Sequence, residues 1–167
     1  KHFATIAKMD GDLETVARLL LDENGDLRFE DNVEALRSVS YALNLLGRES
    51  ETIRLVRSAG KVEGATFRHY IVAVIGTGRW DLMDELYEGD ELKLPVAANL
   101  EMVTKIGLEI NRSGHFQQAY KFMRGFVGDP KYGGNAEFVG VITFAMNHIG
   151  KYDETVGILI SGDGRYC

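Results

Sequence analysis

A glycine recurs at an almost fixed interval along this chain of 167 residues. Successive intervals are 36, 31, 36 and 36 residues, and the glycines are Gly11, Gly47, Gly78, Gly114 and Gly150. The short interval lies between two units, where a linker can shrink without changing a helix. Similar segments at one period of about 20 to 50 residues are the sequence signature of a repeat protein. The fold therefore has to be built from one small structural unit used several times.

The residues around each glycine follow a common plan. Apolar residues before it recur at three- and four-residue steps, as at Leu36, Val39, Leu43 and Leu46. A shorter apolar pattern follows it, as at Phe116, Ala119, Tyr120, Phe122 and Met123. Such stripes are typical of amphipathic helices, and glycine just past a helix end readily adopts the left-handed conformation that closes the last turn. Each unit is predicted to be a helix, a tight turn and a second, antiparallel helix.

An aromatic residue stands two positions after three of the turn glycines, at Trp80, Phe116 and Tyr152. We expect these rings to pack into the angle between the two helices of their own hairpin. The most specific expectation concerns Gly78. It should have a positive φ, with Trp80 buried against Leu86 and the preceding helix at Val74.

The predicted helices span about 1–9, 12–23, 32–46, 49–59, 65–77, 80–88, 95–113, 116–127, 136–149 and 152–160. Asp31 and Asn32 are suitable caps for the helix from residue 32. Pro95 suits the first turn of the helix from residue 95, because that turn needs no N–H from it. The composition of residues 128–135 predicts a loop.

Helical hairpins of this size have to stack on their neighbours to bury their apolar faces. The sequence therefore predicts an all-α fold, a right-handed α-solenoid of about five hairpins that forms a single domain over residues 1–167. The first unit lacks most of its leading helix, and little follows the second helix of the last unit. We therefore expect the chain to be part of a longer one, with further repeats or partner surfaces against its ends.

Composition and charge exclude several classes of protein. The chain has 25 acidic and 19 basic residues and a net charge of −6, the wrong sign for wrapping nucleic acid by phosphate neutralisation alone. No apolar run approaches the roughly 20 residues that a membrane helix needs. Cys167 is the only cysteine, so an internal disulfide and a cysteine metal cluster are excluded, and a reducing compartment is expected.

The sequence predicts no catalytic, metal or cofactor site. No metal-ligand spacing is found among the four histidines, His2, His69, His115 and His148. Residues 22–26 begin like a calcium-binding loop, but Val33 stands where that loop needs a bidentate glutamate. Gly76-Thr-Gly78 lacks the lysine of a phosphate-binding loop. No nucleophile–base arrangement or carboxylate pair stands out, and solenoids mostly present binding surfaces, so we expect a protein that is not an enzyme.

Residues 66–88 resemble a pentatricopeptide repeat (PPR). That motif has Thr-Tyr near the start of its first helix, a leucine four positions before the turn glycine, then Gly-Arg and a helix that ends in Glu-Leu-Phe. Tetratricopeptide repeats are the second choice, and they usually carry a small residue seven positions before the glycine and a tyrosine four positions before it. The residues at these two positions here are Ser40, Ile71, Gly107 and Thr143, and Leu43, Val74, Ile110 and Met146. The aliphatic series and the 36-residue period favour the pentatricopeptide class.

The resemblance implies an organelle, a mitochondrion or a chloroplast, and RNA binding. In that family the residue ten positions before the turn glycine faces a base and is usually Asn, Ser or Thr. The matching residues here are Arg37, Arg68, Thr104 and Gly140. Thr104 suits base recognition, and Gly140 offers a base no contact. The two arginines suit phosphate contacts, stacking, or ion pairs with Glu34 or Glu63.

Two functions follow as hypotheses. The first is a non-catalytic scaffold or accessory subunit that makes protein–protein contacts in a larger organellar complex. The alternative is an organellar RNA-binding protein that acts in RNA processing, stability or translation. The candidate contacts for RNA are Arg37, Arg68, Thr104 and Lys105, on one concave face.

Overall fold

The computed structural model describes residues 12–29, 32–60, 64–88 and 99–161. In these ranges the regular secondary structure is helical, apart from an isolated bridge between Leu21 and Leu27. The predicted all-α class is therefore confirmed. The chain divides into two compact units, residues 1–82 with 90–94 and residues 83–89 with 95–167. The single repeat domain over 1–167 stays a prediction.

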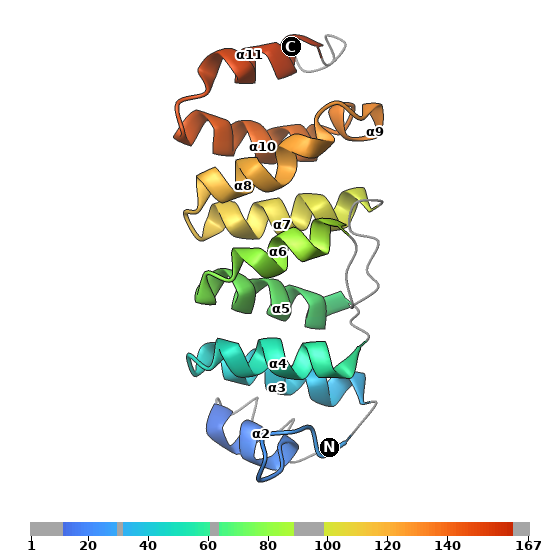
Figure 1. Cartoon of the computed structure of the whole chain (residues 1–167), viewed down its shortest axis with the longest axis vertical. Helices are drawn as coiled ribbons and strands as arrows, with labels where there is room; N and C mark the ends of the chain where they lie inside the picture. Colours follow the sequence, from blue (N-terminus) through green and yellow to red (C-terminus); the bar gives the residue numbers. More distant parts are fainter. Residues whose placement is uncertain (1–11, 30–31, 61–63, 89–98, 162–167) are drawn as a thin grey trace. The chain divides into compact units, whose positions relative to one another are not determined.

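The first unit contains one helical hairpin between two further helices (Figure 1). Its helices are α2 (Leu13–Leu20), α3 (Val33–Leu45), α4 (Glu49–Ala59) and α5 (Gly64–Thr77). Helix α3 contacts α2, α4 and α5, and α4 also contacts α5. The core between them includes aliphatic side chains without solvent exposure, among them Val39, Leu43, Val56 and Val74.

The second unit also contains a hairpin, here followed by two further helices that contact each other. Its elements are α7 (Leu100–Arg112), α8 (Phe116–Met123), the 3-10 helix η2 (Arg124–Phe126), α9 (Pro130–Gly133), α10 (Ala136–His148) and α11 (Tyr152–Ser161). Helix α10 contacts α7, α8, α9 and α11, and α7 contacts α8. In both units, the helix that follows a hairpin therefore contacts both helices of that hairpin. Helix α6 (Trp80–Glu88) spans the boundary between the units, which falls after Leu82.

The turn glycines have the backbone that the sequence predicts. Gly47, Gly78, Gly114 and Gly150 have φ angles of 71°, 66°, 81° and 77°. At each one, the glycine N–H donates to the carbonyl three residues earlier over 3.0 to 3.3 Å, and the next N–H donates to the carbonyl five residues earlier over 2.8 to 3.2 Å. This pair of bonds is the Schellman helix end, which needs a left-handed residue. The positive φ expected at Gly78 is confirmed, and Gly11 lies outside the described residues.

The helix starts are set by asparagine caps that stand 15 residues before their turn glycines. Asn32, Asn99 and Asn135 each accept a hydrogen bond from the backbone N–H three residues later, over 3.1, 3.1 and 2.9 Å. The cap expected at Asn32 is confirmed. The helix expected from residue 95 instead begins at Leu100, because Asn99 caps it. Pro95 lies outside the described residues.

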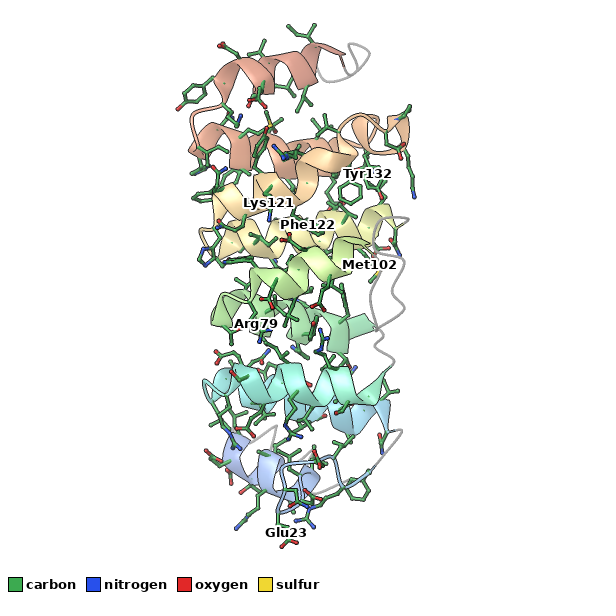
Figure 2. All side chains as sticks on the ribbon, viewed as in Figure 1. Glu23, Arg79, Met102, Lys121, Phe122 and Tyr132 are labelled. Carbon is green, nitrogen blue, oxygen red and sulfur yellow. The ribbon has the colours of Figure 1, made fainter. Side chains whose placement is uncertain are left out.

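Three other predicted boundaries are wrong. Helix α2 ends at Leu20 rather than at residue 23, because the Asp22 carboxylate accepts from backbone N–H groups at residues 24 and 26 and makes a turn there. The helix expected to reach residue 127 changes to a 3-10 turn after Met123. The loop expected over 128–135 contains α9, where Tyr132 is buried with its ring 4.9 Å from that of Phe126 and 5.2 Å from that of Phe138 (Figure 2).

The expected position of the turn aromatics is also corrected. Trp80 is half-buried rather than buried, and Tyr152 is 63% exposed. Phe116 packs on α10, the first helix of the next hairpin, where its ring centroid lies 4.1 Å from that of His148 and 5.9 Å from that of Phe144. The turn aromatic of α8 therefore packs against the following hairpin and not into the angle between the two helices of its own hairpin. No helix follows α11 among the described residues, and Tyr152 accordingly faces solvent there.

Candidate binding surface

Three large apolar side chains of α11 face solvent in one line. Tyr152, Val156 and Ile160 are 63%, 53% and 72% exposed. Their spacing of four residues places them on one face of the helix. The opposite side of α11 contacts α10, and Thr155 is buried there. The exposed line, here named the α11 stripe, is therefore a second apolar face that has no partner helix in the described part of the chain.

The orientation of this stripe is fixed by contacts at the start of α11. The Tyr120 hydroxyl of α8 donates to Glu154 Oε2 over 2.8 Å. Lys151 Nζ donates to Glu154 Oε1 and lies 4.7 Å from the centroid of the Tyr120 ring. The hydrogen bond from Lys151 is the largest cause that lowers the pKa of Glu154, and the same bond raises the pKa of Lys151. Polar contacts of Glu154 therefore hold the start of α11 against α8. The α11 stripe takes no part in these contacts.

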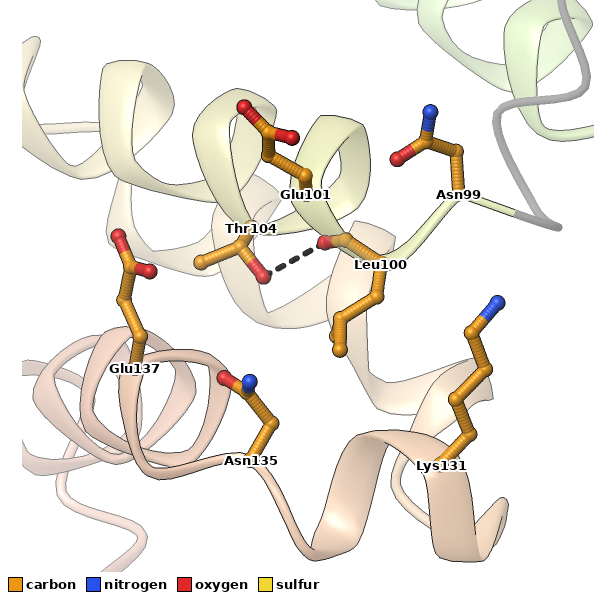
Figure 3. A pocket seen from close by; sticks show the side chains of 7 residues that line it. All are labelled: Asn99, Leu100, Glu101, Thr104, Lys131, Asn135 and Glu137. Atoms are coloured by element: carbon orange, nitrogen blue, oxygen red, sulfur yellow. Dashed lines mark hydrogen bonds between the residues drawn. The ribbon is translucent and has the colours of Figure 1, made fainter.

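A pocket of ≈ 520 Å³ opens between the starts of α7 and α10 (Figure 3). It is lined by Asn99, Leu100, Glu101, Thr104, Lys131, Asn135 and Glu137. Most of its polar groups already have partners in the chain: the two asparagines cap their helices, and the Thr104 hydroxyl donates to the Leu100 carbonyl over 2.8 Å. Two carboxylates and one ammonium group give the lining an excess of negative charge. This arrangement does not favour a phosphate.

The candidate RNA contacts fall in both units. Arg37 and Arg68 belong to the first unit, and Thr104 and Lys105 to the second, so one common concave face stays a prediction.

Two of the candidate cations already bind carboxylates of their own helices. Arg37 Nη2 lies 2.5 Å from Glu34 Oε1, which is the ion pair considered from sequence, and Lys105 pairs with Glu101 one turn earlier. The hydrogen bond from Lys105 is the largest cause that lowers the pKa of Glu101. Thr104 is only 2% exposed. Arg68 is exposed on α5.

Sequence reasoning did not single out Val156 or Ile160. A signal was present, because the segment from Tyr152 to Ile160 carries apolar residues at more than one helical face. A helix that packs against the protein on one side requires one apolar face. A second apolar face therefore indicates a further contact.

The described residues contain no group of three or more His, Cys, Asp or Glu side chains placed to hold a metal ion. Within the same ranges, no helix combines the length and the apolar character required to cross a bilayer.

No family model, curated protein or solved structure matches this chain. The resemblance to pentatricopeptide repeats therefore rests on the sequence motif of residues 66–88.

Proposed function

We propose that this protein is a non-catalytic helical-repeat scaffold that holds a partner protein on the α11 stripe. The observation that carries the proposal is the line of exposed side chains at Tyr152, Val156 and Ile160. Large exposed apolar patches mark interaction sites more often than ordinary surface. A large side chain contributes roughly 1.5 to 3 kcal/mol when it is fully buried from water. Covering this stripe therefore contributes favourably to a complex, against the entropy that association costs.

The repeat architecture is part of the same proposal. In both units the helix after a hairpin contacts both helices of that hairpin, and the Schellman turns at the glycines have one geometry. These contacts support stacked hairpins, an α-solenoid, as the scaffold. Solenoids use extended surfaces to bind other chains. The sequence resemblance supports an organelle as the place where the complex forms.

RNA binding has weaker support. The resemblance of residues 66–88 favours it, but the described contacts do not. Arg37 and Lys105 are paired with glutamates, and Thr104 is covered. A cation that is already neutralised releases fewer counterions from RNA and adds less affinity.

The test is to isolate the tagged protein from the cells that make it, at low salt, with and without the stripe. The stripe variant carries both Val156→Glu and Ile160→Glu. The control carries Leu45→Glu, because Leu45 is equally exposed but lies on α3. We expect the wild-type and control chains to sediment in a stoichiometric protein complex and the stripe variant to sediment alone, with unchanged circular dichroism. A wild-type monomer, or recovery with RNA that nuclease releases, contradicts the proposal.

A further inference from the structure

An asparagine stands three positions before three of the turn glycines, at Asn44, Asn111 and Asn147. In the first unit, Asn44 Nδ2 donates to the His69 carbonyl of α5 over 2.8 Å. In the second unit, Asn111 Nδ2 donates to the Val141 carbonyl of α10, also over 2.8 Å. Both acceptors stand nine positions before the next turn glycine. One pair of repeat positions thus makes the same bond between a hairpin and the helix that follows it in both units.

The two side chains are also used in the same way. The Oδ1 atoms of Asn44 and Asn111 are buried and accept no hydrogen bond from the described residues. An unpaired buried oxygen is unfavourable. The polar contribution of each asparagine to the fold is therefore its bond from Nδ2 to the next helix.

Two positions on α8 complete the surface that receives the next hairpin. Phe116, two positions after the turn glycine, stacks its ring on His148 of α10. Tyr120, six positions after it, bonds to Glu154 of α11. Together with Asn111, these side chains form a junction between one hairpin and the next.

The last hairpin carries the same three positions. Asn147, Tyr152 and Val156 correspond to Asn111, Phe116 and Tyr120, and all three are exposed. Ile160 continues the line. We name Asn147 together with the α11 stripe the end face. It has the donor and the packing positions of the junction, and the described residues contain no helix that follows it.

We propose that the end face binds an amphipathic α-helix of a partner protein, laid against α10 and α11 as α10 is laid against α7 and α8. A backbone carbonyl of that helix accepts from Asn147 Nδ2, and its apolar side covers the α11 stripe. The occupant is a helix because the asparagine bond recurs in both units, and in both the acceptor is a carbonyl of a helix. The choice of a partner protein rests on the proposed scaffold function.

The probe is a labelled, end-blocked peptide of residues 135–149, which contains α10, the helix that covers the equivalent face one hairpin earlier. It is titrated into the full chain and three variants while fluorescence anisotropy is measured. We expect saturable binding that Val156→Glu weakens by at least about tenfold, because it buries a charge. Asn147→Ala should weaken it by about fivefold, the loss of one hydrogen bond. Leu45→Glu should leave the affinity for the peptide unchanged. A scrambled peptide of the same composition should not bind.

A second measurement avoids the low solubility of an apolar peptide. A further copy of residues 126–161, inserted after Ser161, continues the 36-residue period and presents a tethered α10 to the end face. In this lengthened chain, Asn147→Ala should lower the midpoint of thermal unfolding by several degrees. In the chain of 167 residues, where Asn147 is exposed, the same change should leave the midpoint unaltered.

The outcomes separate this inference from the scaffold proposal. The helix site is overturned if the peptide does not bind, or if Asn147→Ala has equal effects in the 167-residue chain and in the lengthened chain. Either result overturns it even where the native complex still depends on Val156 and Ile160. Peptide binding by a chain that is isolated from cells as a free monomer overturns the scaffold proposal instead. Dimerisation of the chain that Val156→Glu abolishes, without peptide binding, assigns the face to a second copy and overturns the partner helix.

Discussion

A Cβ atom on Gly107 of α7 would lie 2.2 Å from Met123 Sδ of α8. Met123 is fully buried, so its thioether has little room to move away. Alanine is favoured over glycine by about 1 kcal/mol in a helix interior, but overpacking costs about 1 to 3 kcal/mol. We expect Gly107→Ala to lower the free energy of unfolding by about 1 kcal/mol, measured by urea denaturation.

Gly140 provides the control for this prediction. It also lies inside a helix, α10, and a Cβ atom there meets nothing within 4 Å. Gly140→Ala should raise the free energy of unfolding by about 0.5 to 1 kcal/mol. With Met123→Ala in the same chain, Gly107→Ala should also become stabilising. Equal effects at the two glycines would show that the close approach to Met123 is not a constraint.

The sequence predicts the turns of this fold better than its contacts. Gly78 and Gly114 could be found because a left-handed residue at a helix end requires glycine, a local rule that leaves a mark at a fixed spacing. Gly107 could not be interpreted in this way. Glycine is required there because Met123 packs against it from the antiparallel helix. Met123 is 16 residues away in the sequence, beyond the reach of any local helix or turn pattern.

The candidate surface was predicted less well for the same reason. The position of Tyr152 after a turn glycine predicts a side chain packed inside its own hairpin, whereas Phe116 at the same position packs on the next hairpin. Arg37 and Lys105 have carboxylates one helical turn away, which sequence does show. Which asparagine reaches the next helix depends on how the hairpins stack, and this needs the structure.

Substitutions at Gly78 should show the strain of its left-handed backbone. Its φ is 66°, and open space surrounds a Cβ atom there, so a cost arises from the backbone alone. A β-branched residue in this conformation costs about 1 to 3 kcal/mol. We expect Gly78→Val to lower the thermal midpoint by several degrees, and Gly78→Asn to lower it by much less, because asparagine tolerates the conformation. Identical losses for the two would rule out backbone strain as the cause.

The acid sensitivity of the first unit should depend on Asp12, the cap of α2. Hydrogen bonds from the side chain and the backbone N–H of Thr15 hold the pKa of Asp12 below its ordinary value of 3.8. A lowered pKa means that the charged cap stabilises the fold above that value and that the benefit is lost as the pH falls through the folded pKa.

Asp12→Asn keeps an accepting oxygen but no longer titrates. The thermal midpoint of the wild-type chain should exceed that of the variant at about pH 7, and the difference should shrink below about pH 3.8. Other acidic groups titrate equally in both chains, so they cancel in the difference. A gap that stays constant over this range would mean that the charge on Asp12 does not stabilise α2.

Phe116 and Tyr152 hold the same repeat position and should respond differently to truncation. Phe116 is half-buried against rings of α10, whereas Tyr152 projects from the end face into solvent. Phe116→Ala should cost about 1 to 3 kcal/mol, because it removes ring contacts and leaves a gap between two hairpins. Tyr152→Ala should change the free energy of unfolding by less than about 0.5 kcal/mol, as an exposed substitution does. Urea denaturation of both variants measures the difference. A loss at Tyr152 as large as that at Phe116 would mean that this side chain is already covered within the chain, and the end face would then have no room for a partner.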